Sequence, residues 1–266
     1  MPVRIVNSKQ NARLKELRRA LRSPDRHGGV IGIEGPHLLE EAARAGLRIE
    51  TIFLGDAASH FDLESRDCEV IVAPDSILSS VLETETPQPV AALVEPPQWS
   101  WTDVLVPGQS NGLIVVLAGL QDPGNLGTIL RSAEAFGASG IVALPGTASH
   151  WNQKAMRASA GSVFRLPVIQ AGVDECFARL REAGVTTMTT ALKDATPANA
   201  LDFTRPAAIV IGNEGNGVPE EIARRADGAV TIPCPGPVES LNASIAASIL
   251  LYECSVQRSA GRRNHA

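Results

Sequence analysis

The chain has 266 residues, a net charge of −5 and a composition of 44% hydrophobic and 20% charged residues, which predicts a soluble globular protein of one large domain or two ordinary ones. No stretch reaches the roughly 18 apolar residues of a membrane helix, and the N-terminus lacks the apolar core of a secretory signal, so we expect a cytoplasmic protein without membrane contact. The four cysteines and five histidines are dispersed, which argues against a disulfide framework and against a metal site.

The first 26 residues are strongly basic, with eight Lys and Arg against two acidic residues, which leaves a net charge of −11 for the rest of the chain. The acidic whole excludes a protein that simply coats nucleic acid, but a basic arm can contact phosphates locally. The alternative of equal weight is a solvated amphipathic helix. We predict RNA contacts for four of these cations: Arg13, Lys15, Arg18 and Arg19.

The first third of the chain alternates short apolar segments with helical patterns. Ser8 is the expected N-cap of a helix that ends near Arg22. Strands are expected at 30–33, 49–54, 68–73 and 90–94, and helices at 36–45 and 75–82. This alternation predicts a small α/β domain over residues 1–95. The proline-rich segment that follows, 96–112, is the expected linker.

The second half opens with a continuous Val and Leu run over 112–120, typical of a strand buried on both faces of a parallel sheet. The same pattern predicts a mostly parallel sheet with helices on both faces. The further strands are expected at 140–144, 185–192, 207–212 and 229–233, and the helices at 125–136, 152–159, 173–183, 219–225 and 240–257. Ligands bind beyond the carboxyl ends of such strands, so the strand-to-helix junctions are the places to search.

The first junction with unusual chemistry spans residues 121–137. Asn125 can cap the helix that follows, and Gly137 can end it. Arg131 falls off the apolar stripe of that helix, so we expect its side chain to face away from the core. A well-capped structural helix with a surface arginine is the alternative interpretation.

Two further junctions follow buried strands. At 211–218, three glycines would let the backbone approach a ligand, and Glu214 disfavours a phosphate and suits a cation or donor groups. At 232–244, three prolines stiffen the entry, and Ser240 is the expected N-cap of an apolar helix. The alternatives are an ordinary turn and a plain proline-rich loop with a cap.

Together the three junctions resemble the three signature motifs of the SpoU (TrmH-like) branch of the SPOUT RNA methyltransferases. The first motif has the form P-x-N-x-G-x-x-x-R and is matched by Pro123, Asn125, Gly127 and Arg131. The second has the form G-x-E-x-x-G and is matched by Gly212, Glu214 and Gly217. The third, I-P followed by S-L-N, is matched by Ile232, Pro233, Ser240, Leu241 and Asn242. The segments NSKQNARLKELRRAL and IEGPHLLEEA resemble, more softly, the L30e-like substrate-binding domain of that family.

The resemblance implies a SPOUT domain over residues 113–258 with a deep trefoil knot, a basic tail at 259–266, and a homodimer. It implies S-adenosylmethionine as the cofactor, held largely through the backbone of Gly212, Ile232 and Leu241. The third motif departs from the commonest form, since Cys234 replaces a frequent Met and two prolines are extra. None of these departures falls on a transferred polar position.

The reaction that the resemblance implies is methyl transfer to a ribose 2′-OH. Arg131 is then the principal catalytic residue, and because a guanidinium holds its proton very tightly, we expect it to grip a phosphate and stabilise alkoxide charge instead of acting as a base. The resemblance and side-chain chemistry assign supporting catalytic roles. Asn125 and Asn242 would position ribose and backbone, Ser240 would hold the chain near the cofactor, and Glu214 would orient Arg131 or Asn125.

The substrate expected from the separate N-terminal domain is RNA, with 23S ribosomal RNA as the first candidate and tRNA as the alternative. A non-catalytic RNA-binding or ribosome-assembly protein of the same fold would lose Arg131 or the S-L-N segment, and this chain keeps both. A nicotinamide-dependent enzyme is excluded because the chain lacks G-x-G-x-x-G after the first strand of the second half.

Overall fold

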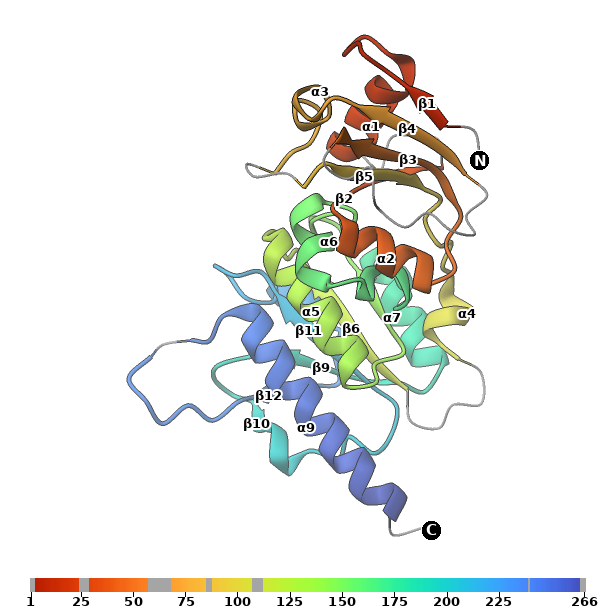
Figure 1. Ribbon diagram of the computed structural model, residues 1–266. Coiled ribbons are helices and arrows are strands. Elements are labelled where there is room, and N and C mark those ends of the chain that lie inside the picture. The colour runs from red at the N-terminus through yellow and green to blue at the C-terminus, as the bar shows by residue number, and fades with distance from the viewer. Residues whose placement is uncertain are drawn as a thin grey trace. The chain divides into compact units, whose positions relative to one another are not determined.

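A computed structural model describes residues 3–23, 29–56, 68–84, 88–106, 112–238 and 240–263 of the chain (Figure 1). The chain divides into two units. The first comprises residues 1–98 together with 151–164, and the second comprises 99–150 together with 165–266. A short segment from the second half of the sequence therefore completes the first unit.

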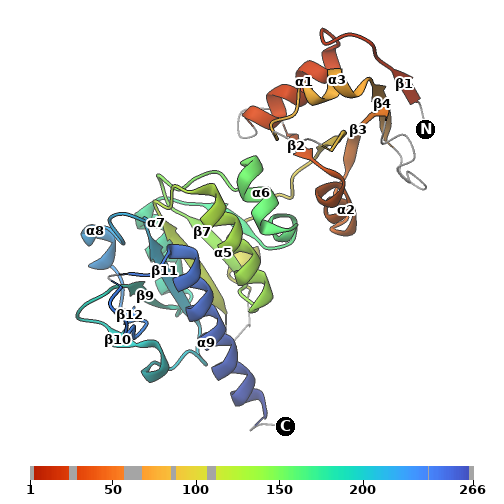
Figure 2. The same cartoon turned by 60° about the vertical axis from the view of Figure 1, so that its left-hand side comes forward.

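The first unit is built on a five-stranded mixed sheet. Its strands lie in the order β1 (Val3–Ile5), β4 (Glu69–Ala73), β3 (Ile49–Gly55), β5 (Val90–Val94) and β2 (Ile31–Glu34), and β5 runs antiparallel to both of its neighbours. Helices α1 (Ala12–Arg22) and α3 (Asp75–Ser79) cover one face, and α2 (Pro36–Arg44) covers the other (Figure 2). Leu14, Leu17 and Leu21 of α1 are buried against this sheet, each stabilising the unit by about 1.5–3 kcal/mol.

The segment 151–164 protects the edge of this sheet. It contains α6 (Gln153–Ser159) and the short helix η3 (Ser162–Phe164), and its ends are joined by stacking of Trp151 on Phe164, with ring centroids 6.4 Å apart. Gln153 is buried, and its Nε2 donates to the carbonyl of Gly32 in the edge strand β2 at 2.7 Å. The hydrogen bond satisfies a strand carbonyl that has no neighbouring strand to bind.

The second unit is built on a seven-stranded sheet in which every strand pair is parallel. The central strands β11 and β6 are buried along their whole length, which confirms the prediction from the Val and Leu runs. In sheet order the strands are β10 (Thr196–Pro197), β12 (Gly228–Thr231), β9 (Thr186–Thr190), β11 (Ala207–Gly212), β6 (Leu113–Ala118), β7 (Gly140–Ala143) and β8 (Val168–Gln170).

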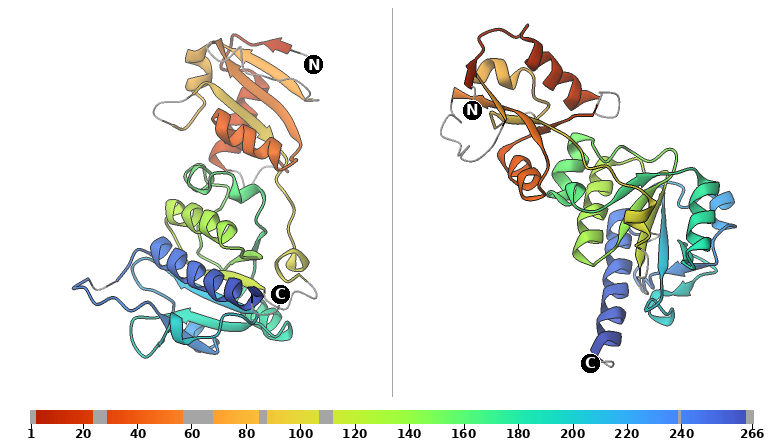
Figure 3. Two further views of the ribbon diagram at one scale, coloured as in Figure 1. Left: turned by 60° about the horizontal axis from the view of Figure 1, so that its bottom comes forward. Right: turned by 90° about the vertical axis from the view of Figure 1, so that its right-hand side faces the viewer.

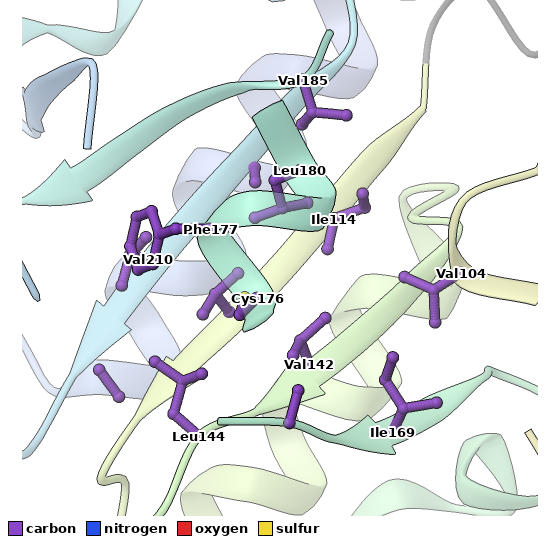
Figure 4. Close-up of a cluster of buried hydrophobic side chains, with 14 of the residues drawn as sticks. Val104, Ile114, Val142, Leu144, Ile169, Cys176, Phe177, Leu180, Val185 and Val210 are labelled. Carbon is purple, nitrogen blue, oxygen red and sulfur yellow. The ribbon is translucent and has the colours of Figure 1, made fainter. Parts of the chain in front are cut away.

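Helices cover both faces of this sheet, as predicted (Figure 3). On one face α7 (Val173–Glu182), α4 (Trp101–Val104) and α8 (Glu220–Ala223) bury a cluster of aliphatic side chains (Figure 4). Burial in that cluster, helped by the charge of Glu175, raises the pKa of the Cys176 thiol to about 12, as suits a packing residue. On the other face α5 (Pro123–Ala135) and α9 (Ala243–Arg263) lie side by side.

Three predicted helix caps are wrong. Helix α1 is capped by Asn11, whose side chain accepts from the backbone N–H of Arg13 at 2.9 Å, because Ser8 belongs to the turn before it. Helix α9 is capped by Asn242, not Ser240. In addition, α5 starts earlier than predicted, because Asp122 accepts from the N–H of Gly124 and so caps it in place of Asn125.

The remaining differences concern short elements and one helix end. The strands β1, β8 and β10 have three residues or fewer, too short for a periodic pattern to show in the sequence. Helix α4 forms within the proline-rich segment because Ser100 and Asp103 make a capping box. Helix α9 extends beyond the predicted end at 257. Arg258 on that extension donates to the carbonyls of Phe203, Arg205 and Gly112 at 2.7, 3.1 and 3.2 Å.

No helix among the described residues is long and apolar enough to cross a bilayer.

Candidate functional site

The three motif junctions meet at one edge of the second sheet. Strands β6 and β11 are neighbours, and Ala118 at the end of one pairs with Gly212 at the end of the other. The loops that begin at Gly119 and Asn213 therefore start side by side. The third loop, 232–242, follows β12, which is separated from β11 by β9 in the same sheet. All three loops leave the carboxyl ends of their strands, where ligands bind in sheets of this kind.

The Glu214 carboxylate holds the first junction. Its Oε2 accepts from the backbone N–H of Gln121 at 3.2 Å, and its Oε1 accepts from the N–H of Asp122 at 3.0 Å and from Nδ2 of Asn125 at 3.1 Å. Burial alone would raise the pKa of Glu214, but the hydrogen bonds from Asn125 and from these backbone groups lower it below its usual value. Of the two partners suggested for Glu214, the structure therefore selects Asn125 and not Arg131.

Asn125 and Asn242 continue the same network into the third junction. Nδ2 of Asn242 donates to Oδ1 of Asn125 at 3.1 Å. Oδ1 of Asn242 accepts from the backbone N–H and the hydroxyl of Ser244 at 2.9 and 2.7 Å. Because the carboxylate can only accept and the helix N–H groups can only donate, both amide orientations follow from their partners. A continuous chain, Glu214–Asn125–Asn242, thus joins the three loops.

Gly212 is required by the loop that it opens. Asn213 and Gly217 exchange two backbone hydrogen bonds of 2.9 Å, which folds residues 213–217 tightly back on themselves. A Cβ on Gly212 would lie 2.0 Å from the carbonyl carbon of Gly217, closer than real contacts allow. Nδ2 of Asn213 also donates to the carbonyl of Gly119 at 3.0 Å, so this loop is attached to the first junction too.

Arg131 is exposed on α5, about two turns beyond Asn125. Within the ranges that the structure describes, its guanidinium makes neither a hydrogen bond nor an ion pair. Such a group is available to an anionic ligand from outside the chain. Ser240 is likewise exposed, and its hydroxyl has no partner among the described residues. Ile232 and Leu241 are half-buried in the third loop.

The sequence does not indicate that the loop after β9 lies at the candidate site. Strand β9 lies between β11 and β12, and Thr189 pairs with Val210 of the one while Thr190 pairs with Val230 of the other. Residues 191 and 192 therefore lie at the same edge as the motif loops. Leu192 is 70% exposed, so its apolar side chain is accessible at this edge. Only the order of the strands in space indicates this loop, since no motif marks it.

The four predicted RNA contacts on α1 differ in their surroundings. The Arg13 guanidinium donates to Glu16 at 2.8 Å and to Glu69 of β4 at 3.0 Å, and these carboxylates raise its pKa. Arg18 makes a long 3.4 Å contact with the carbonyl of Ser80. Lys15 and Arg19 have no partner in the described part of the chain. Arg13 therefore attaches α1 to the sheet, whereas Lys15, Arg18 and Arg19 are more available to a ligand.

No group of three or more potential metal-ligating side chains occurs in the ranges that the structure describes.

Comparison with known proteins places the chain in a family. The model of the SpoU rRNA methylase family matches residues 112–252, which include all three motif loops. The chain belongs to the SpoU rRNA methylase family. A second model, for the substrate-binding domain of RNA 2′-O ribose methyltransferases, matches residues 33–100.

Other members of the SpoU family align over almost the whole chain. The 23S rRNA (guanosine(2553)-2′-O)-methyltransferase RlmP of Bacillus subtilis strain 168 is 32% identical over 249 residues, covering 93% of this chain and 97% of RlmP. The SpoU methyltransferase AviRb of Streptomyces viridochromogenes, solved with its cofactor AdoMet, matches with a TM-score of 0.84 and 29% identity over 94% of this chain and 99% of AviRb. An AdoMet-bound rRNA methyltransferase of Sinorhizobium meliloti matches with a TM-score of 0.82 and 30% identity, covering 95% and 97% of the two chains.

The family match covers the part of the chain that carries the polar junction. Glu214, Asn125 and Asn242 all lie within the matched range, although they come from three separate loops. Arg131 belongs to the first motif but stands outside that hydrogen-bonded chain. This chain therefore carries an available guanidinium, that of Arg131, beside a pre-assembled polar junction.

Proposed function

We propose that the protein transfers a methyl group from S-adenosylmethionine to a ribose 2′-OH of 23S ribosomal RNA. The observation that carries this proposal is the junction at the carboxyl edge of the second sheet, where Glu214, Asn125 and Asn242 join three loops and Arg131 on α5 remains available. Family membership and the similarity to RlmP, a 23S rRNA 2′-O-methyltransferase, support the reaction and the class of substrate.

The cofactor site that we propose lies among the loops after β9, β11 and β12. The backbone of Gly212, Ile232 and Leu241 supplies polar contacts there, and the exposed Leu192 offers an apolar surface to an adenine or ribose. The negative Glu214 suits a cationic ligand better than a phosphate. When bound, S-adenosylmethionine supplies a methyl group made electrophilic by a positive sulfonium. We further propose that residues 232–242 complete a deep trefoil knot around this site.

Arg131 acts on the RNA in this proposal. The 2′-OH becomes a good nucleophile as it passes its proton to solvent water, and a guanidinium stabilises the developing alkoxide without giving up its own proton. Its planar fork also matches the oxygens of the neighbouring phosphate. Asn125, Asn242 and Glu214 use their polar groups on one another, so we assign them the role of holding the loops in place. The free hydroxyl of Ser240 contacts the bound RNA chain.

The RNA that we propose is 23S ribosomal RNA, with tRNA as the second candidate, because related staphylococcal proteins are named as TrmH family tRNA/rRNA methyltransferases. An enzyme with either substrate works in the cytoplasm. Mapping of 2′-O-methyl sites in total RNA, from cells with and without the gene, tests the proposal. We expect one site in 23S RNA to disappear. A site lost from tRNA instead would favour the second candidate, and no lost site in either would contradict both.

RNA binding by the first unit is proposed for the cations on α1 that are not used in the fold. Neutralising Lys15, Arg18 and Arg19 to alanine should weaken RNA binding and lower the slope of log affinity against log salt by about 0.7–0.9 for each lost phosphate contact. Arg13→Ala should instead lower the unfolding temperature and change the salt slope less, because Glu16 and Glu69 occupy its guanidinium.

Filter binding across a salt series, combined with thermal unfolding, measures both effects. Arg48→Ala is the matched control, since Arg48 pairs with Glu95 in the same unit. If the triple variant keeps the salt slope of the wild type, the α1 face is only solvated and does not bind RNA.

A homodimer is proposed from an apolar stripe along α9. The side chains of Ile245, Ile249, Tyr252 and Val256 are 52%, 40%, 57% and 44% exposed and follow one face of the helix. The ring of Tyr252 also packs against Phe136 of α5. A contiguous exposed apolar face of this kind marks a protein interface more often than a solvated surface.

Light scattering at micromolar concentration should give the mass of a dimer. Ile249→Asp should weaken association by about 30-fold or more, the effect of losing a contact worth about 2 kcal/mol at the centre of an interface. Ile5→Asp is the control, because Ile5 is equally apolar and 73% exposed but lies in the first unit. A monomeric wild type, or a dimer that Ile249→Asp leaves intact, would contradict this interface.

A further inference from the structure

Two serine hydroxyls join α5 to α9 beyond the motif loops. Oγ of Ser132 and Oγ of Ser248 are 2.7 Å apart. The Ser248 hydroxyl also lies 2.7 Å from the carbonyl of Ser244, to which it donates. Because each hydroxyl has one proton, Ser132 must donate to Ser248. Both serines are half-buried, and neither belongs to the polar chain of the junction.

This pair lies between two other contacts along the two helices, which lie side by side (Figure 1). The first contact joins Asn125 to Asn242 near the start of each helix. The second joins Phe136 to Tyr252, with ring centroids 5.7 Å apart. The contacts advance in the same direction along both helices, so α5 and α9 run parallel to one another.

The hydroxyl pair makes the register of this helix pair specific. The surface around it is largely apolar, with Thr128, Ile245 and Ile249 beside Ser248. Apolar contacts tolerate a small slide of one helix along another, whereas a hydroxyl bond does not. A slide would leave the half-buried Ser132 hydroxyl without its partner, which costs about 1–3 kcal/mol.

Arg131 immediately precedes Ser132 on α5. The hydrogen bond from Ser132 to Ser248 fixes the position of Ser132 along α9, the helix that Asn242 caps. It therefore also fixes the position of the neighbouring Arg131 along α9. We propose that Ser132 and Ser248 are positioning residues for methyl transfer: their bond places the Arg131 guanidinium in register with the Glu214–Asn125–Asn242 junction. This inference rests on the proposed function.

The test compares Ser132→Ala in two backgrounds under single-turnover conditions, with RNA and S-adenosylmethionine both saturating. In the otherwise wild-type enzyme the rate should fall about 10- to 100-fold, the loss expected when a catalytic group is misplaced by about 1 Å. In the Arg131→Ala background the same change should lower the rate less than about twofold, because the group that it positions is absent. Ser248→Ala should reproduce the effect of Ser132→Ala, and the double serine variant should be no slower than either.

Ser255→Ala on α9 is the matched control and should keep the wild-type rate, because Ser255 has no partner among the described residues. Cofactor and RNA affinities of the serine variants should stay within about twofold of the wild type, and light scattering should give the same mass. An unchanged rate, an equal fall in both backgrounds, or a fall that accompanies loss of the dimer would each overturn the inference. A wild-type enzyme that transfers no methyl group would instead refute the proposed function.

Discussion

Arg131→Ala should lower the single-turnover rate of methyl transfer about 100- to 1,000-fold at saturating RNA, the loss measured when one donor to a developing oxyanion is removed. The reason is that Arg131 is the guanidinium beside the junction that the described part of the fold leaves without a partner. Cofactor affinity, measured by calorimetry, should stay nearly intact, because the proposed cofactor contacts come from other loops.

The sharper variant is Arg131→Lys. Lysine keeps the positive charge but loses the planar fork, so the rate should lie well below that of the wild type. Arg224→Ala is the control, since Arg224 is an exposed arginine of the same unit that pairs with Glu220. A wild-type rate in Arg131→Lys would mean that the fork is unnecessary and that our role for Arg131 is wrong.

Gly212→Val should weaken binding of S-adenosylmethionine at least about 100-fold, since added methyl groups in a packed site cost about 1–3 kcal/mol each and the space here is already closed. A Cβ at this position meets the backbone of Gly217 and Val218 at 2.0 and 2.2 Å, and a backbone atom cannot turn aside as a side chain can. The loop 213–217 must therefore open, and its contact with Gly119 is lost.

Gly215→Ala separates this effect from a general intolerance of the loop. Its Cβ would meet only the Asn213 side chain, at an ordinary 3.5 Å, so binding should be close to that of the wild type. Cys234 offers a second readout, because it is the one exposed cysteine of the four and lies in the third loop. Cofactor should slow its alkylation in the wild type and not in Gly212→Val. Unaltered affinity in Gly212→Val would remove this loop as the binding site.

The sheet of the second unit could be predicted because its strands are buried on both faces. The runs at 113–118 and 207–212 contain no polar residue, a pattern typical of a parallel strand that is covered on both faces. The helix caps could not be predicted from local sequence. Ser8 and Asn11 are both good caps, as are Ser240 and Asn242, and the choice depends on contacts made elsewhere, such as that of Asn242 with Asn125.

The site was predictable in its membership but not in its connections. The motifs indicate Glu214, Asn125 and Asn242, but which of them touch depends on β11 lying beside β6. The same holds for the basic arm, where the pattern shows a cation at Arg13 but not the carboxylate of Glu69, 56 residues away, that binds it. Long-range pairing of this kind leaves no local signal in the sequence.

The segment 151–164 is the clearest example of such a limit. Its helix was predicted at 152–159 and is found at Gln153–Ser159, but nothing in its composition indicates that it completes the first unit. Two of its contacts with that unit are a side-chain amide on a strand carbonyl and Gly161 packed against Glu41. Gly161 has a φ of +87°, a backbone conformation that residues with a side chain rarely adopt. Both this conformation and the contact with Glu41 therefore require glycine.

The position of the transferred methyl group tests most directly whether the protein is a ribose 2′-O-methyltransferase. Purified protein is incubated with 23S RNA transcript and S-adenosylmethionine labelled in its methyl group, and the RNA is then hydrolysed in alkali. A 2′-O-methyl group blocks attack of that oxygen on the next phosphate, so we predict label in an alkali-resistant dinucleotide, and far less of it with Arg131→Ala. Label recovered in mononucleotides, or no transfer to RNA by a protein that binds the cofactor, would contradict a ribose 2′-O-methyltransferase.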